Sequence, residues 1–93
     1  MYITIVDIDE YLGAESFIIN QELLLEKDID NRRDDESIKV VSDKNTLLGY
    51  VANSVNDVAR GTHSAGYIYN TLQNNQKCTV KFILDGKIIA ELI

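Results

Sequence analysis

Two apolar segments flank an Asp-Gly dipeptide at residues 85–86, with VKFIL before it and KIIAELI after it. A two-residue Asp-Gly connection between such segments favours a β-hairpin with a type I′ turn. In this register Phe82 lies opposite Ile89, and Ile83 lies opposite Ile88. The two pairs fall on opposite faces, so both faces of the hairpin carry apolar side chains. A sheet of this kind is expected to curl into a small barrel with a filled interior and a helix over part of its outside.

Four further segments have the composition of β-strands, being rich in β-branched and other apolar residues. They are residues 1–9, 22–28, 37–42 and 46–51. The segments between them, 10–21 and 28–37, are polar or contain glycine and predict loops. With the terminal hairpin this gives six strands, and we predict a mainly β (α+β) fold consisting of a small six-stranded OB-like barrel.

Two short helices are predicted between the fourth strand and the hairpin. Ser54 and Asp57 have the spacing of a capping box, and Gly61 would end the first helix. Thr62 or Ser64 can cap the second. The apolar side chains of the expected helices are Val55, Val58 and Ala59 in the first, and Ala65, Ile68, Tyr69 and Leu72 in the second.

The 93 residues are expected to form a single domain, residues 1–93, because the chain has ordinary apolar and charged content and no visible linker or repeat. Its single cysteine, Cys78, excludes an intramolecular disulfide. Neither a signal peptide nor an apolar run near 20 residues is present, which predicts a cytoplasmic protein that does not enter a membrane. The sequence does not determine the oligomeric state.

Charge is distributed unevenly along the chain, whose net charge is −6. Residues 1–36 contain eleven acidic and three basic residues, whereas residues 37–93 contain four acidic and six basic residues. Non-specific nucleic-acid binding depends on Lys and Arg neutralising phosphates, so this composition argues against that mode of binding. A local binding site remains compatible with it.

Metal, cofactor and catalytic sites are not predicted. The segment 28–39 begins like a calcium loop, but it has Arg33 in place of the required glycine and Lys39 in place of the final glutamate. His63 and Cys78 each lack the nearby partner that a zinc site requires. No nucleophile elbow, paired-carboxylate spacing or glycine-rich phosphate loop is present, so we do not expect an enzyme.

Two segments, ELLLEKDIDNRRDDESIKVV and LLGYV, resemble the HIRAN domain, a small module found fused to Swi/Snf-type helicases and as free-standing bacterial proteins. The resemblance is to the free-standing bacterial branch, and it implies a six-stranded barrel related to the OB-fold. In this family a leucine-rich strand leads into a D-x-x-N-x-x-D-x-x-A-I-x-V pattern, followed by a turn and a G-Y/H-V strand. The matching residues are Asp28, Asn31, Asp34, Ile38 and Val40, then Gly49, Tyr50 and Val51, with Ser37 in place of the alanine.

The resemblance implies recognition of single-stranded DNA, and in one branch of its free 3′ end, without catalysis. Tyr11, Asn31 and Tyr50 are the positions most compatible with base or sugar contacts. We also expect a polar-loop contact by Arg33, which stands where the DNA-binding branch has an aromatic residue, and a phosphate contact by Arg60. Asn53 occupies the position of a lysine in the DNA-binding branch. The candidate nucleic-acid-binding residues are therefore Tyr11, Asn31, Arg33, Tyr50, Asn53 and Arg60.

The sequence also supports a second hypothesis, in which the domain has lost DNA binding and acts as a protein-interaction or regulatory module. Asp9 and Glu10 replace a basic-aromatic pair of the DNA-binding branch. Each carboxylate would repel a phosphate by about 1 kcal/mol at contact distance in water. A protein partner would instead use an exposed sheet edge or the acidic N-terminal third.

Overall fold

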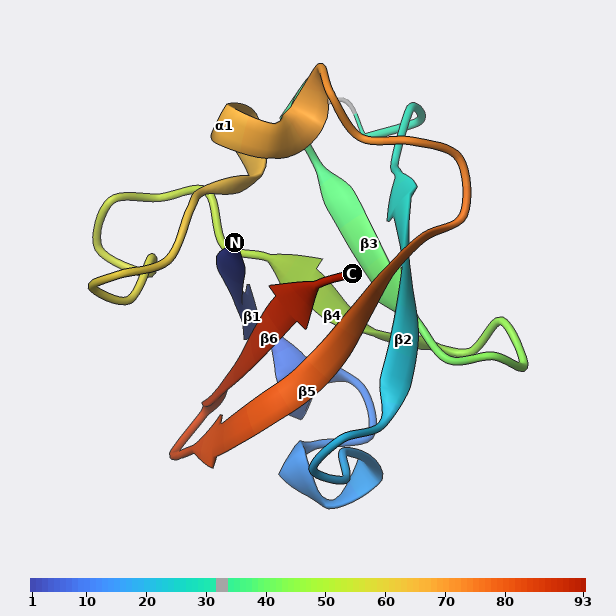
Figure 1. The fold of residues 1–93 in the computed structure, drawn as a ribbon, viewed down its shortest axis with the longest axis vertical. Helices are drawn as coiled ribbons and strands as arrows, with labels where there is room; N and C mark the ends of the chain where they lie inside the picture. Colours follow the sequence, from blue (N-terminus) through green and yellow to red (C-terminus); the bar gives the residue numbers. More distant parts are fainter. Residues whose placement is uncertain (32–33) are drawn as a thin grey trace.

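The computed structural model describes residues 1–31 and 34–93, which form a closed antiparallel β-barrel (Figure 1). Its strands follow the order β1-β4-β3-β2-β5-β6, and β6 closes the barrel against β1. The predicted fold class is therefore confirmed. The strands of the described residues are β1 (Tyr2–Val6), β2 (Glu22–Lys27), β3 (Ile38–Val41), β4 (Leu47–Val51), β5 (Gln76–Leu84) and β6 (Lys87–Leu92).

The interior of the barrel is filled by aliphatic side chains from all six strands. Side chains alternate between the two faces of a strand, so one residue in two points inward. Fully buried examples are Ile5, Leu25, Val40, Val80 and Ile88. Figure 1 shows the α-helix at one end of the barrel and the segment that follows β1 at the other. Both ends of the core are therefore covered.

The terminal hairpin has the predicted register, because Phe82 pairs with Ile89 and Ile83 pairs with Ile88. The predicted type I′ turn is wrong. Of the two central residues of this turn, Asp85 and Gly86, only Gly86 has a positive φ, 76°, whereas a type I′ turn requires positive φ at both. Positive φ at the second central residue alone is the pattern of a type II turn, which also favours glycine there.

The second predicted helix is present as α1 (Ala65–Tyr69). Ser64 caps it, since its hydroxyl accepts a hydrogen bond from the Tyr67 N–H at 3.2 Å. Ala65 and Ile68 are buried against the barrel core, as the apolar spacing predicted. The helix is shorter than predicted, because it ends at Tyr69 and leaves Leu72, which packs partly buried against the core, beyond its end. No helix in the described part of the chain is both long and apolar enough to span a bilayer.

The first predicted helix does not form, and Val55, placed on its apolar face, is 88% exposed. The N–H groups of Asp57 and Val58 both donate to the Ser54 carbonyl, which makes a single turn. The Ala59 N–H then donates to the Thr4 hydroxyl on β1 at 3.1 Å instead of continuing a helix. This tertiary hydrogen bond is made in place of the helical hydrogen bond that the local sequence favours.

The first strand was predicted to run to residue 9, but β1 ends at Val6, and the segment between β1 and β2 contains two short 3₁₀-helices, η1 (Ile8–Glu10) and η2 (Ala14–Ser16), where residues 10–21 were predicted as a loop. Ile8, the first residue of η1, and Phe17, which follows η2, are buried. Asp7 precedes η1 in the left-handed conformation, with φ of 61°. This residue turns the chain away from β1 and directs Tyr11 back toward the barrel wall.

Candidate functional site

Four of the six candidate residues, Tyr11, Asn31, Tyr50 and Asn53, line one pocket of about 340 Å³. We call it the tyrosine pocket. It lies where three segments meet: the turn after β1, the described residues of the loop between β2 and β3, and the end of β4. The remaining lining residues are Val6, Asp7, Glu10, Asp34, Ser37, Val51, Ser54 and Asp57.

The two tyrosines form one wall of the pocket. Their ring centroids are 6.2 Å apart and the rings are tilted by 45°. Tyr50 projects from β4 and is partly buried, whereas Tyr11 follows η1 and is 39% exposed. Tyr11 therefore offers the more accessible aromatic face to a ligand.

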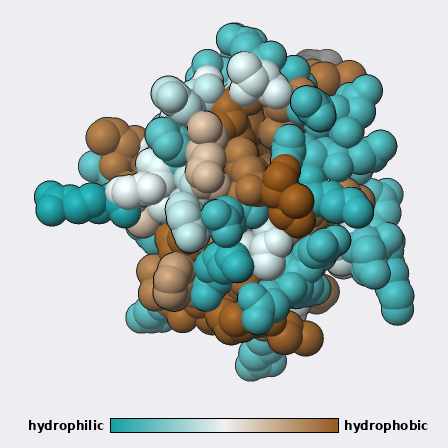
Figure 2. Space-filling model, in the orientation of Figure 1, coloured by the Kyte–Doolittle hydropathy of each residue, from teal (hydrophilic) through white to brown (hydrophobic). Residues whose placement is uncertain are grey.

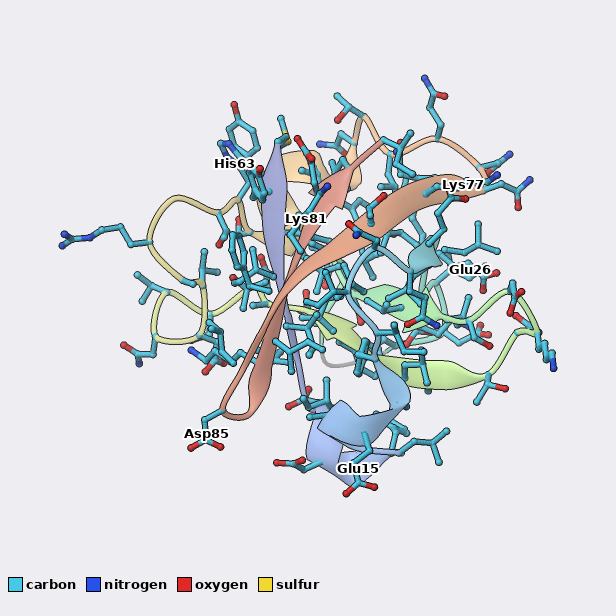
Figure 3. The ribbon with its side chains drawn as sticks, turned by 60° about the horizontal axis from the view of Figure 1, so that its bottom comes forward. Glu15, Glu26, His63, Lys77, Lys81 and Asp85 are labelled. Carbon is cyan, nitrogen blue, oxygen red and sulfur yellow. The ribbon has the colours of Figure 1, made fainter. Side chains whose placement is uncertain are left out.

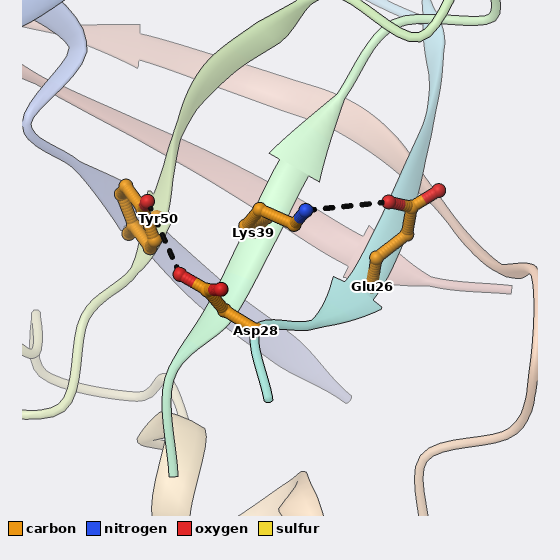
Figure 4. Close-up of polar contacts among 4 residues, drawn as sticks. All are labelled: Glu26, Asp28, Lys39 and Tyr50. Carbon is orange, nitrogen blue, oxygen red and sulfur yellow. Dashed lines mark hydrogen bonds and ion pairs between the residues drawn. The ribbon is translucent and has the colours of Figure 1, made fainter. Parts of the chain in front are cut away.

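The Tyr50 hydroxyl donates a hydrogen bond to Oδ2 of Asp28 at 3.3 Å (Figure 4). Burial, together with the neighbouring Tyr11 hydroxyl and the Asp28 carboxylate, raises the pKa of Tyr50 to about 12. All of these causes disfavour a phenolate. Tyr50 is therefore a neutral hydrogen-bonding group over the whole physiological range.

Asn31 organises the described ends of the loop that follows β2. Its Oδ1 atom accepts a hydrogen bond from the Asp34 N–H at 3.2 Å, and its Nδ2 donates to the Ser37 hydroxyl at 3.1 Å. Ser37 is buried. Asn31 thus has a structural role in shaping the pocket wall in addition to the contact role that the resemblance implies.

Asn53 connects the same loop to the α-helix. Its Nδ2 donates to Asp34 at 3.4 Å and to Glu36 at 3.3 Å, and its Oδ1 accepts from the Gly66 N–H at 2.8 Å. These three contacts occupy most of the amide's hydrogen-bonding capacity. A lysine at this position, as in the DNA-binding branch of the resembled family, could not accept the bond from Gly66.

The described lining of the pocket is acidic. Asp7, Glu10, Asp34 and Asp57 line it, and none of its described lining residues is a lysine or arginine. Lys39, the cross-strand neighbour of Tyr50, directs its ammonium toward Glu26 at 3.9 Å, on the side away from Tyr50 (Figure 4). The lining therefore favours hydrogen-bond donors and cations and disfavours phosphate.

The other two candidates are not placed in this pocket. Arg60 lines a separate, more apolar groove that also includes Tyr2, Phe82 and Leu84. Arg33 lies outside the described residues. Among the described residues, no group of three His, Cys, Asp or Glu side chains is arranged to hold a metal ion.

Sequence reasoning missed two of the lining carboxylates, Asp7 and Asp57. Asp7 was assigned to the end of a strand and Asp57 to a helix cap. Barrel closure brings them together, because β1 pairs with β4 and places Val6 beside Tyr50. No local signal distinguishes such residues from other exposed aspartates. Glu10, noted as a replacement for a basic residue, does line the pocket, whereas Asp9 does not.

Comparison with known proteins supports the fold. No family model matches the sequence, and no curated protein matches it. The structure is similar to the crystal structure of a protein from Lactobacillus plantarum solved by a structural genomics consortium, with a TM-score of 0.66 and 17% sequence identity. The match covers 98% of this chain and 87% of the other. At this identity the likeness establishes a shared barrel architecture and nothing about activity.

Proposed function

We propose that this protein is a non-catalytic binding module that holds the terminal nucleoside of a single-stranded nucleic acid in the tyrosine pocket. The observation that carries the proposal is the convergence of Tyr11, Asn31, Tyr50 and Asn53 on one concave surface. These residues come from three separate segments of the chain. The resemblance to the HIRAN domain supplies the ligand class.

The pocket volume and chemistry suit a nucleoside. At about 340 Å³ it lies within the range of small-molecule sites. A base stacked on the exposed Tyr11 ring would contribute roughly 1–3 kcal/mol. Carboxylates accept hydrogen bonds from sugar hydroxyls and base amino groups, and Asp7, Glu10 and Asp57 line the pocket for this.

The same carboxylates would distinguish a strand end that carries a hydroxyl from one that carries a phosphate. A terminal phosphate would be repelled by about 1 kcal/mol for each carboxylate at contact distance in water. A terminal hydroxyl can instead donate a hydrogen bond to a carboxylate. We therefore propose that the pocket accepts a free 3′-hydroxyl end and rejects a 3′-phosphorylated one.

Fluorescence anisotropy with short oligonucleotides labelled at the 5′ end tests this proposal. We expect a 3′-hydroxyl strand to bind at least about tenfold more tightly than the same strand with a 3′-phosphate. Because few phosphates are neutralised, affinity should depend only weakly on salt. Equal affinity for the two ends, or no binding at low salt, would contradict the proposal.

Paired variants locate the binding site in the same assay. Tyr11→Ala should weaken binding about tenfold, because it removes the exposed stacking face. Arg60→Ala is the matched control, since Arg60 is exposed but lines a different groove. We expect it to bind like the unmodified protein. If Arg60→Ala weakens binding and Tyr11→Ala does not, the nucleic-acid site is the groove that contains Arg60.

A second candidate function is supported by the acidic lining. A protein module that binds an arginine or lysine side chain would use carboxylates beside aromatic rings, as this pocket provides. An arginine-rich peptide should then bind with a steep loss of affinity as salt rises. If the peptide binds and the 3′-hydroxyl strand does not, this second function is the correct one.

A further inference from the structure

The tip of the terminal hairpin extends beyond the part of the barrel wall that β2 covers. The paired residues of β2 and β5 run only from Gln76 to Thr79 on β5. The last bonds on that side join Val80 to Asn20 and Gln21. Within the described part of the chain, residues 81–84 pair with β6 alone. We call residues 81–88 the hairpin arm (Figure 1).

The free edge of the arm is apolar. Phe82, Ile83 and Leu84 are consecutive and are 56%, 39% and 47% exposed. Figure 2 shows hydrophobic surface across the lower part of the view, which holds both the hairpin tip and the segment that follows β1. Exposed sheet edges in monomeric proteins are usually interrupted by charges or prolines. These three positions carry neither.

The backbone at the centre of this edge is oriented for pairing. In an antiparallel pair, residues that exchange hydrogen bonds alternate with residues that do not. Leu84 and Lys87 flank the two-residue turn and form a hydrogen-bonded pair, so the next pair, Ile83 and Ile88, does not exchange bonds. The N–H and C=O groups of Ile83 therefore point away from β6, toward the free edge.

We propose that the free edge of the hairpin arm pairs with the same edge of a second copy of this chain, antiparallel and centred on Ile83. The register makes the sequence complementary to itself. Phe82 lies opposite Leu84 of the second copy. Lys81, whose Nζ lies 3.8 Å from Oε1 of Glu91 within its own chain, lies opposite Asp85 of the second copy and would exchange the one carboxylate for the other or share both. Figure 3 shows Asp85 at the tip of the arm and Lys81 farther along β5.

The side chains of this arrangement form one apolar cluster. Phe82 and Leu84 lie on the same face of β5 and line a groove of about 340 Å³ with Tyr2 and Ile89. Pairing two arms would bring two such faces side by side and continue the β5–β6 sheet across both copies. A two-fold axis relates the two copies, so each contact away from the axis, including the charge pair, occurs twice in the dimer.

The expected dimer is weak and concentration-dependent. A stable interface buries roughly 800 Å² on each partner, and a four-residue strand edge with its adjoining groove is smaller than most such interfaces. Surface ion pairs such as Lys81 with Asp85 contribute little energy. Their role here is to fix the register of the two strands.

Sedimentation equilibrium of the full chain, from micromolar to millimolar concentration, tests the proposal. We expect a reversible monomer–dimer equilibrium. Ile83→Lys should raise the dimer Kd at least about tenfold, because it places two like charges at the two-fold axis. Ile29→Lys is the matched control, since Ile29 is 81% exposed on a different surface, and it should leave the Kd unchanged.

Charge exchange tests the register and guards against misfolding of a single variant. Lys81→Asp and Asp85→Lys should each weaken the dimer, and the double exchange should restore it, with circular dichroism verifying the fold of each protein. A monomer at every concentration, an unchanged Kd in folded Ile83→Lys, or a double exchange no tighter than the single variants would overturn the proposal. None of these results bears on nucleic-acid binding, which is measured separately.

Discussion

At the scale of the residue, Gly49 and Tyr50 show how closely the pocket wall is fitted to the barrel. A Cβ added at Gly49 would lie 2.7 Å from the Val6 carbonyl oxygen and 3.1–3.2 Å from the Ile5 and Ile8 methyl groups. The close approach of β4 to the end of β1 therefore requires glycine. It positions Tyr50, the next residue, over the pocket.

Gly49→Ala should destabilise the protein by about 1–3 kcal/mol, because the added methyl group meets backbone that cannot move freely. Gly66→Ala is the matched control. There the shortest contact of the new Cβ, 2.7 Å, is to the carboxylate of Glu36, an exposed and flexible side chain that can move aside, and alanine favours the helix by up to about 1 kcal/mol. Urea unfolding of both variants measures the difference. Equal destabilisation would contradict this account.

The raised pKa values of Tyr50 and Cys78, both about 12, predict a specific alkaline instability. In the unfolded chain these groups lose protons at lower pH, from about 9 for the thiol and about 10 for the phenol. The unfolded state then binds fewer protons than the folded state, so the free energy of unfolding falls as pH rises from 9 to 12. Below about pH 8, where the unfolded-state thiol still holds its proton, these two groups should cause no change.

Absorbance titration of tyrosinate checks the assignment to Tyr50. The folded protein should show one tyrosine that ionises after the others, and Tyr50→Phe should remove that last step. If the variant retains the step, the residue with the raised pKa is another of the five tyrosines.

At the scale of the element, tertiary contacts decide which of the elements predicted from the local sequence form. The hairpin register was predictable because the Asp-Gly turn and the apolar segments lie within 14 residues of one another. The segment after Ser54 was predicted to be a helix but forms a single turn. The turn could not be predicted, because the hydrogen-bond acceptor of the Ala59 N–H is the Thr4 hydroxyl on β1, which is distant in the sequence. The Thr4 and Thr62 hydroxyls are 2.7 Å apart, and Thr4 is fully buried.

Thr4→Val should destabilise the protein by about 1–3 kcal/mol, although valine has nearly the same shape. The change leaves the Ala59 N–H without its acceptor and the Thr62 hydroxyl without its Thr4 partner. Thr46→Val, on the exposed turn before β4, should change stability by less than about 0.5 kcal/mol. Chemical denaturation compares them, and an equal effect of the two changes would mean that the Thr4 contacts do not stabilise the turn.

At the scale of the whole molecule, barrel closure creates the candidate site. Apolar alternation and the family resemblance were sufficient to predict the barrel and to select Tyr11, Asn31, Tyr50 and Asn53, which do lie together. They were not sufficient to predict the acidic lining, because Asp7 and Asp57 reach the pocket only when β1 pairs with β4. The structure likewise separates Arg60 from these residues, although it lies only seven positions after Asn53 in the sequence.

We propose that the end of a nucleic-acid strand binds in the tyrosine pocket. NMR titration of the labelled protein with a short 3′-hydroxyl oligonucleotide tests it most directly. We predict that the largest shift changes occur at Tyr11, Asn31, Tyr50 and Asn53, and that a 3′-phosphorylated strand causes much smaller ones. Shift changes confined to another surface, or none at saturating oligonucleotide, would contradict the claim.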